Sequence, residues 1–291
     1  MFIATLLTHP TGALDPNMIG TLRNRFGGGN ITWLNPKSAA EFTMSASPPN
    51  HDNVWQSLQG QEIDFVVQPA GNRRKKLLLA DMDSTMIGQE CIDELAATAG
   101  VGDQVKAITA RAMDGALNFE DALRARVALL KGAPADIIAD VLNRRITPVS
   151  GGATLVATMK AHGAYTALVS GGFTAFTAWV AQTLGFDDHR ANTLLIENNV
   201  LMGDVARPIL GRAAKVEALA DSTNRLSIGA HDVLAIGDGA NDLGMIEHAG
   251  LGVAVHAKPI VQAQAQHRIN HGDLTALLYI QGYHMAEFVN P

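Results

Sequence analysis

The sequence predicts an α/β protein, in which an open, largely parallel sheet follows a smaller α+β domain. Short apolar runs such as residues 77–80 suit strands that a parallel sheet buries on both faces, and helical segments separate most of them. The first 72 residues differ, because they hold six of the eleven prolines and two of the three tryptophans. At 291 residues the chain has room for about two domains of roughly 150 residues each.

The first 72 residues follow the order strand, helix, strand, strand, helix, strand. Glycines at 27–29 end the first helix, and residues 63–67 suit a strand of alternating burial. Residues 69–72 are expected to be a linker, and the basic run at 73–76 a solvated junction. The expected strands are residues 2–7, 31–34, 41–44 and 63–67, and the expected helices are residues 15–26 and 52–58.

A helical insertion is expected directly after the strand at 77–80. From residue 90 to 145 the apolar positions repeat with helical spacing, which predicts four short helices with no strand between them. Asn118 is expected to cap the third helix, with Asp121 at the third position inside it. Breaks between the helices fall near residues 100–102, 114–115 and 132–134.

Strands and helices alternate again after the insertion, which completes the predicted open sheet. The expected strands are residues 165–169, 233–236, 252–255 and 267–270, and the expected helices are residues 153–162, 175–184, 212–219 and 242–248. We expect an N-terminal domain at 1–72 and a second domain at 73–291. The second domain comprises a core, residues 73–87 and 147–291, and a helical cap, residues 88–146.

Composition narrows the classes of function. Lys and Arg total 22 against 28 Asp and Glu, and the net charge of −6 argues against a basic nucleic-acid-binding surface. The single cysteine, Cys91, excludes a disulfide within the chain and favours a reducing, cytoplasmic setting. No apolar run reaches the roughly 18 residues of a membrane span, and the start lacks a basic signal region. We expect a cytoplasmic enzyme or regulatory binding protein.

Three expected core strands end in polar residues, where open α/β sheets bind their ligands. Asp81 and Asp83 follow the first of these strands, and their carboxylates point to the same side because side chains alternate along a strand. Together with Asp238 they would repel one another unless a cation or protons intervene. Oxygen ligands alone favour a hard cation such as Mg²⁺. The second strand ends in Ser170-Gly171-Gly172, whose hydroxyl and amides can hold an anion.

Competing motifs fail on spacing. A calcium loop opening at Asp81 needs Gly at its sixth position and Glu at its twelfth, where this chain has Met86 and Ile92. A loop opening at Asp238 fails as well, because Leu243 is in its sixth place. No glycine precedes a lysine directly, so a P-loop is excluded.

Four segments in order resemble the motifs of the haloacid dehalogenase (HAD) superfamily, and the resemblance covers roughly residues 74–270. These segments are Asp81-Met-Asp83-Ser-Thr85, Ser170-Gly-Gly, Lys215 and Gly237-Asp-Gly-Ala-Asn-Asp242. Within that superfamily the chain is similar to the phosphoserine phosphatase family, whose features in the insertion are matched by Glu90, Phe119 and Arg126. The resemblance implies a HAD-like Rossmannoid sheet with a four-helix cap. It also implies Mg²⁺-dependent hydrolysis of O-phospho-L-serine, the last step of serine biosynthesis.

The resemblance implies catalytic roles for four residues. Asp81 would attack phosphorus and form an aspartyl-phosphate, and Asp83 would protonate the leaving alkoxide and then activate water. Ser170, the amide of Gly171 and Lys215 would bind the phosphoryl oxygens.

The implied metal ligands are Asp81, the Asp83 backbone carbonyl and Asp238, with Asp242 supporting the metal through water or hydrogen bonds. Asn241 would contact Lys215 or the phosphate.

The cap would set specificity. Arg126 can fork onto the substrate carboxylate and Glu90 can pair with its ammonium. Phe119 and Met113 would close an apolar wall that excludes water.

Alternatives remain open at this point. The rival enzyme is a HAD phosphatase or phosphotransferase acting on another small phosphorylated metabolite, such as phosphohomoserine. A rival of another class is a non-catalytic sensor of phosphorylated metabolites, against which the pair Asp81 and Asp83 argues. The N-terminal domain resembles ACT-type regulatory domains in element order. It is expected either to sense amino acids or form a homodimer, or to be a structural appendage.

Overall fold

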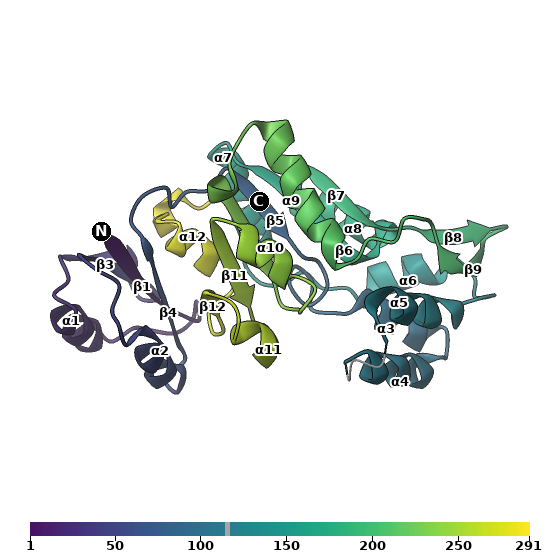
Figure 1. The fold of residues 1–291 in the computed structure, drawn as a ribbon, viewed down its shortest axis with the longest axis horizontal. Helices are drawn as coiled ribbons and strands as arrows, with labels where there is room; N and C mark the ends of the chain where they lie inside the picture. The colour runs from purple at the N-terminus through teal and green to yellow at the C-terminus, as the bar shows by residue number, and fades with distance from the viewer. Residues whose placement is uncertain (114–116) are drawn as a thin grey trace.

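The computed structural model describes residues 1–113 and 117–291. Figure 1 shows three parts in a row: the N-terminal domain at one end, a six-stranded sheet with its helices in the middle, and the cap helices at the other end. The α/β class and the helical insertion are both confirmed. No helix in the described ranges is long and apolar enough to cross a membrane.

The N-terminal domain is a four-stranded antiparallel sheet, ordered β2-β3-β1-β4, with two helices. Asp15 caps α1, because its carboxylate accepts the N–H of Asn17. The expected element order is confirmed, but β4 is buried along its first six residues rather than alternately. The elements are β1 (Phe2–Thr8), α1 (Pro16–Arg25), β2 (Ile31–Asn35), β3 (Ala39–Met44), α2 (His51–Gln59) and β4 (Ile63–Pro69).

The core sheet has the order β12-β11-β10-β5-β6-β7, and each neighbouring pair is parallel. Its strands are β5 (Leu77–Ala80), β6 (Tyr165–Phe173), β7 (Asp188–Asn192), β10 (Val233–Gly237), β11 (Leu251–Val255) and β12 (His267–Ile269). Its helices are α7 (Gly152–Ala161), α8 (Thr174–Leu184), α9 (Arg212–Leu226), α10 (Leu243–His248), α11 (Pro259–Gln262) and α12 (Ala276–Ile280).

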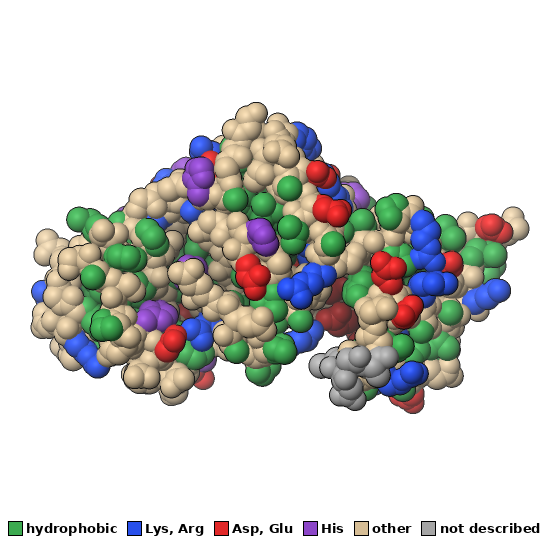
Figure 2. Space-filling model, viewed as in Figure 1, with side chains coloured by type: hydrophobic (Ala, Val, Ile, Leu, Met, Phe, Trp, Pro, Cys, Tyr) green, Lys and Arg blue, Asp and Glu red, His purple; other side chains and the backbone are tan. Residues whose placement is uncertain are grey.

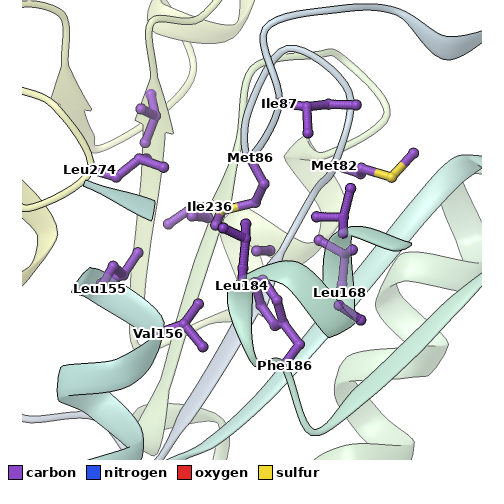
Figure 3. Packing of buried hydrophobic residues seen from close by; sticks show 14 of the residues in the cluster. Met82, Met86, Ile87, Leu155, Val156, Leu168, Leu184, Phe186, Ile236 and Leu274 are labelled. Carbon is purple, nitrogen blue, oxygen red and sulfur yellow. The ribbon is translucent and has the colours of Figure 1, made fainter. Parts of the chain in front are cut away.

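The loop that follows β5 is anchored in the hydrophobic core. Figure 3 shows Met82 and Met86 of this loop among apolar side chains such as Ile236 of β10. Met82, Met86 and Ile87 are fully buried. This packing fixes the loop that carries Asp81 and Asp83.

The cap contains α3 (Cys91–Thr98), α4 (Gly102–Met113), α5 (Phe119–Ala128) and α6 (Ile137–Arg144). Asn118 caps α5 as expected, since its side chain accepts the N–H of Asp121 at 2.9 Å. Cys91 is fully buried and free, as expected of a packing residue.

A hairpin of the core, β8 (Leu194–Glu197) and β9 (Val200–Val205), packs on the cap. Leu201 exchanges backbone hydrogen bonds with Gly132 and Ala133, each 2.9 Å long. The strands β7, β8 and β9 were not predicted from the sequence. The Asn198-Asn199 turn, with positive φ at both residues, is the signal that predicts such a hairpin.

The basic run at 73–76 is solvated only in part: Arg74 and Lys76 are exposed as expected, whereas Lys75 is buried and Arg73 is largely buried. Arg73 lies 2.5 Å from Glu41 of the N-terminal domain, with both side chains largely buried. Arg74 pairs with Glu287 and lies 4.1 Å from the centre of the Tyr283 ring. The pair of Arg73 and Glu41 joins the two domains, whereas the contacts of Arg74 lie within the second domain.

A second contact joins the domains at β4 and β12. The buried carboxylate of Asp64 accepts backbone N–H groups from Asn270, His271 and Gly272, at 2.7, 3.0 and 2.7 Å. Because Asp64 is fully buried, these bonds replace its hydration.

Candidate active site

A cavity of about 480 Å³ lies between the carboxyl ends of the core strands and the cap. In Figure 2 the surface is hollowed between core and cap, with acidic side chains deep in the hollow. The core wall includes Asp81, Asp83, Ser170, Gly171, Asp238, Asn241 and Lys258, and the cap wall includes Glu90, Asp93, Thr109, Phe119 and Arg126. Most of these residues were predicted from the sequence, but Asp93, Thr109 and Lys258 were not.

Lys215 forms a buried ion-paired triad with Asp81 and Asp242. Its Nζ lies 2.5 Å from Oδ1 of Asp81 and contacts Oδ1 of Asp242. Burial alone would lower the pKa of Lys215, but Asp242 and Asp81 outweigh it and raise that pKa above its ordinary value. Burial, and then the charge of Asp242, raises the pKa of Asp81. The lysine therefore stays charged and holds the carboxylate of Asp81 in one position.

Three carboxylates form a candidate metal centre. Oxygen atoms of Asp81, Asp238 and Asp242 lie within 4.8 Å of one another, and all three residues are buried. The cations nearby are Lys215 and the half-exposed Lys258, so negative charge is in excess. An all-oxygen set with excess negative charge fits a hard divalent cation.

Asp83 lies apart from this carboxylate cluster. The side chain of Asp83 is not among the grouped ligands, and the expected metal contact through its backbone carbonyl stays a prediction. Oδ1 of Asp83 accepts the N–H of Cys91 at 3.3 Å. Burial, followed by the charge of Glu90, raises the pKa of Asp83 to about 7, so this carboxyl can hold a proton near neutral pH.

The motif Ser170-Gly171-Gly172 lies inside β6, which extends further than expected. The Ser170 hydroxyl accepts the N–H of Gly172 at 2.8 Å. Any side chain at Gly172 would crowd Asp83, because an added Cβ would lie 2.8 Å from Oδ2 of Asp83. An added Cβ at Gly171 would lie 2.9 Å from the Phe119 ring of the cap. Glycine at 171 lets core and cap approach closely, and glycine at 172 leaves room for the side chain of Asp83.

Glu90 and Arg126 carry opposite charges on the cap wall. Oε1 of Glu90 accepts the hydroxyl of Ser84 at 2.9 Å. Nε of Arg126 donates to the carbonyl of Ala122 at 3.2 Å, and within the described ranges no carboxylate lies within 4.0 Å of Arg126. Burial lowers the pKa of Arg126. A partly buried guanidinium without a carboxylate partner is suited to bind an anion.

The predicted roles of Asn241 and Met113 are not both seen in the structure. Asn241 lines the cavity, and its amide donates to Asp242 at 3.4 Å; the expected contact with Lys215 is not among its hydrogen bonds in the part of the chain that is described. Met113 ends α4, and its side chain lies outside the described residues. Its role in the apolar wall stays a prediction.

Lys258 was missed although a simple rule could have found it. It follows β11 by three residues, and its Nζ lies 3.5 Å from Oδ2 of Asp238. Its backbone N–H also donates to the carbonyl of Asp238 at 3.1 Å. Ligands bind at the carboxyl ends of the strands in open α/β sheets, and the same rule applied to the predicted strand at 252–255 would have placed this lysine at the site.

The order of these strand-end residues matches a known family model. The model described as haloacid dehalogenase-like hydrolase matches residues 78–247. The chain belongs to this family. A phosphoserine phosphatase of Haemophilus influenzae is 46% identical over 202 residues, covering 69% of this chain and 64% of that protein. The match thus spans just under two thirds of that relative's length.

Solved structures of HAD-like proteins extend the comparison. A HAD family hydrolase from Salmonella enterica serovar Typhi has a TM-score of 0.87 at 32% identity, covering 96% of this chain and 97% of the other. A phospho-aspartyl intermediate analogue of a phosphoserine phosphatase has a TM-score of 0.66 at 42% identity, covering 71% and 98%. The first of these matches includes the N-terminal domain, because it covers nearly the whole chain.

Proposed function

We propose that this HAD-like hydrolase converts O-phospho-L-serine to L-serine and phosphate, as the last step of serine biosynthesis. The observation that carries the proposal is the charge arrangement of one cavity. Asp81, Asp83 and Ser170 lie on its core wall, and Glu90 and Arg126 lie on its cap wall. A phosphoserine placed across the cavity directs its phosphate to the core, its ammonium to Glu90 and its carboxylate to Arg126.

In the first proposed step, Asp81 attacks phosphorus and the bond from phosphorus to the serine oxygen breaks. Lys215 orients the attacking carboxylate, since the two groups are 2.5 Å apart. Asp83 gives its proton to the leaving serine oxygen, which departs as L-serine. The Ser170 hydroxyl and the Gly171 amide bind phosphoryl oxygens.

In the second step, Asp83 takes a proton from water, and the resulting oxygen attacks the phosphoryl group on Asp81. Phosphate leaves and the Asp81 carboxylate is restored. Mg²⁺ held by Asp81, Asp238 and Asp242 would supply positive charge beside the transferring phosphoryl group.

The experiment is phosphate release from a panel of phosphoserine, phosphothreonine, phosphohomoserine and a sugar phosphate. We expect phosphoserine to be cleaved with the highest kcat/KM in Mg²⁺, and activity to be lost in EDTA and restored by added Mg²⁺. Equal kcat/KM across the panel would contradict the substrate, and a higher value for phosphohomoserine would favour the rival phosphatase. Full activity in EDTA would contradict the metal.

A compartment and an oligomeric state are proposed as well. The cytoplasm is the proposed compartment, supported by the single, buried and free Cys91; fractionation of the native cells tests it. A homodimer is proposed through the N-terminal domain, supported by the position of β2 at the edge of its sheet. Light scattering of the purified protein tests it, with a monomer as the contradicting result.

A further inference from the structure

Two polar atoms of the cap are buried in the structure without a hydrogen-bond partner among the described residues. They are Oδ1 of Asp93 on α3 and Oγ1 of Thr109 on α4. Both residues line the same cavity as the catalytic carboxylates. Because buried polar atoms in folded proteins are nearly always paired, these two atoms point to a partner that enters the cavity.

Asp93 lies beside Glu90 at the start of α3. Glu90 is the N-cap residue of α3 and Asp93 is in its first turn, and both line the cavity. Glu90 already accepts one hydrogen bond, from the Ser84 hydroxyl at 2.9 Å. Burial, and then the charge of Glu90, raises the pKa of Asp93 by more than the charges of Arg126 and Lys106 lower it. A cation with several N–H donors would supply both carboxylates with hydrogen bonds and relieve their repulsion.

The hydroxyl of Thr109 is available to the substrate carboxylate that Arg126 would bind. Arg126 uses its Nε for the Ala122 carbonyl, which leaves its terminal nitrogens for the cavity. A carboxylate has two oxygens and accepts about four hydrogen bonds, so a guanidinium alone does not satisfy it. A hydroxyl on the same wall can donate to the second oxygen.

We propose that Asp93 and Thr109 are further specificity-determining residues for an amino-acid phosphate. Asp93 accepts from the substrate ammonium together with Glu90, and Thr109 donates to the substrate carboxylate together with Arg126. This rests on the proposed function, because it assigns second partners to the two groups that distinguish phosphoserine from other phosphate esters.

The test measures KM of Asp93→Asn and Thr109→Val for three compounds. They are phosphoserine, phosphoethanolamine, which lacks the carboxylate, and 3-phosphoglycerate, which has a hydroxyl in place of the ammonium. Asp93→Asn should raise KM about tenfold for the two compounds with an ammonium, and much less for 3-phosphoglycerate. Thr109→Val should raise KM severalfold for the two compounds with a carboxylate, and much less for phosphoethanolamine.

The controls separate recognition from folding. Asp103→Asn removes an exposed charge from the same helix as Thr109 and should leave every KM unchanged. Thr109→Ser keeps the hydroxyl and should restore KM to within twofold of the natural protein. Equal changes across the three compounds, or no change, would overturn the inference. If the natural protein shows no preference for phosphoserine over the other two, the proposed function itself fails.

Discussion

Lys215 Nζ lies 2.5 Å from Oδ1 of Asp81, although 134 positions of the sequence separate the two residues. The strand β5 delivers the carboxylate and the helix α9 delivers the ammonium, and both groups are nearly excluded from solvent. Asp242 also contacts this ammonium. The triad therefore couples the proposed nucleophile to a residue of the candidate metal centre. Removing Lys215 leaves two buried carboxylates without their partner.

Lys215→Met is expected to lower kcat by at least about 100-fold, because the cation that orients Asp81 and faces the developing phosphoryl charge is lost. Lys215→Arg should not restore the rate, since a planar guanidinium does not fit the point contact made by a buried ammonium. Steady-state kinetics with phosphoserine measure both variants. A rate within tenfold of the natural protein for Lys215→Met would contradict the assigned role.

Asp81→Asn is expected to lower kcat by at least about 10⁴-fold, because an amide is a poor nucleophile. The decisive measurement is acid quenching after a short exposure to phosphoserine whose phosphate group is radiolabelled. The label that stays on the protein is then counted. The matched variant Asp83→Asn keeps the nucleophile and should still take up label, although slowly. Label on Asp81→Asn comparable to that on the natural protein would exclude this residue as the site of attack.

Arg126→Ala is expected to raise KM for phosphoserine about 100-fold, since a charge-assisted bidentate contact is lost. KM for phosphoethanolamine should change far less, because that compound has no carboxylate for the guanidinium. The measurement is the ratio of the increase in KM for phosphoserine to the increase in KM for phosphoethanolamine. Equal increases for both compounds would show that Arg126 acts on the cap as a whole and not on the carboxylate.

His267 makes the stability of the fold sensitive to acid. Burial lowers the pKa of His267 to about 4. Between about pH 6.5 and pH 4 this side chain is therefore protonated in the unfolded chain but neutral in the folded chain. The free energy of unfolding should fall by about 2 kcal/mol from this group as the pH decreases from 7 to 5. Denaturant unfolding of the natural protein and of His267→Gln, at both values, isolates the contribution. An identical pH dependence of the two proteins would contradict it.

Most of the core wall of the cavity could be predicted from the sequence because its residues lie in the last part of an apolar strand or directly after one. Asp81, Ser170 and Asp238 each lie where a strand delivers them, and parallel strands bring their carboxyl ends to one edge. The cap wall was harder, because helical periodicity does not say which face meets the core. Asp93 and Thr109 have the spacing of ordinary helix residues, and only their position in the cavity marks them.

The junction between the domains shows why a local rule failed. The run at 73–76 has the composition of a solvated segment, and its partners Glu41, Asp232 and Glu287 are far from it in the sequence. No local pattern encodes such pairs. The hairpin β8–β9 failed for another reason, since its strands are short and half-exposed, and they gain their order from the cap beside them.

The three amides that Asp64 binds lie next to β12, the outermost strand of the core sheet. The N-terminal domain thus covers the open edge of the core sheet at β12. A catalytic fragment that starts at residue 73 would lose this cover and expose unpaired backbone donors, which are templates for pairing between molecules. Such a fragment is therefore expected to aggregate at concentrations where the whole chain remains dispersed.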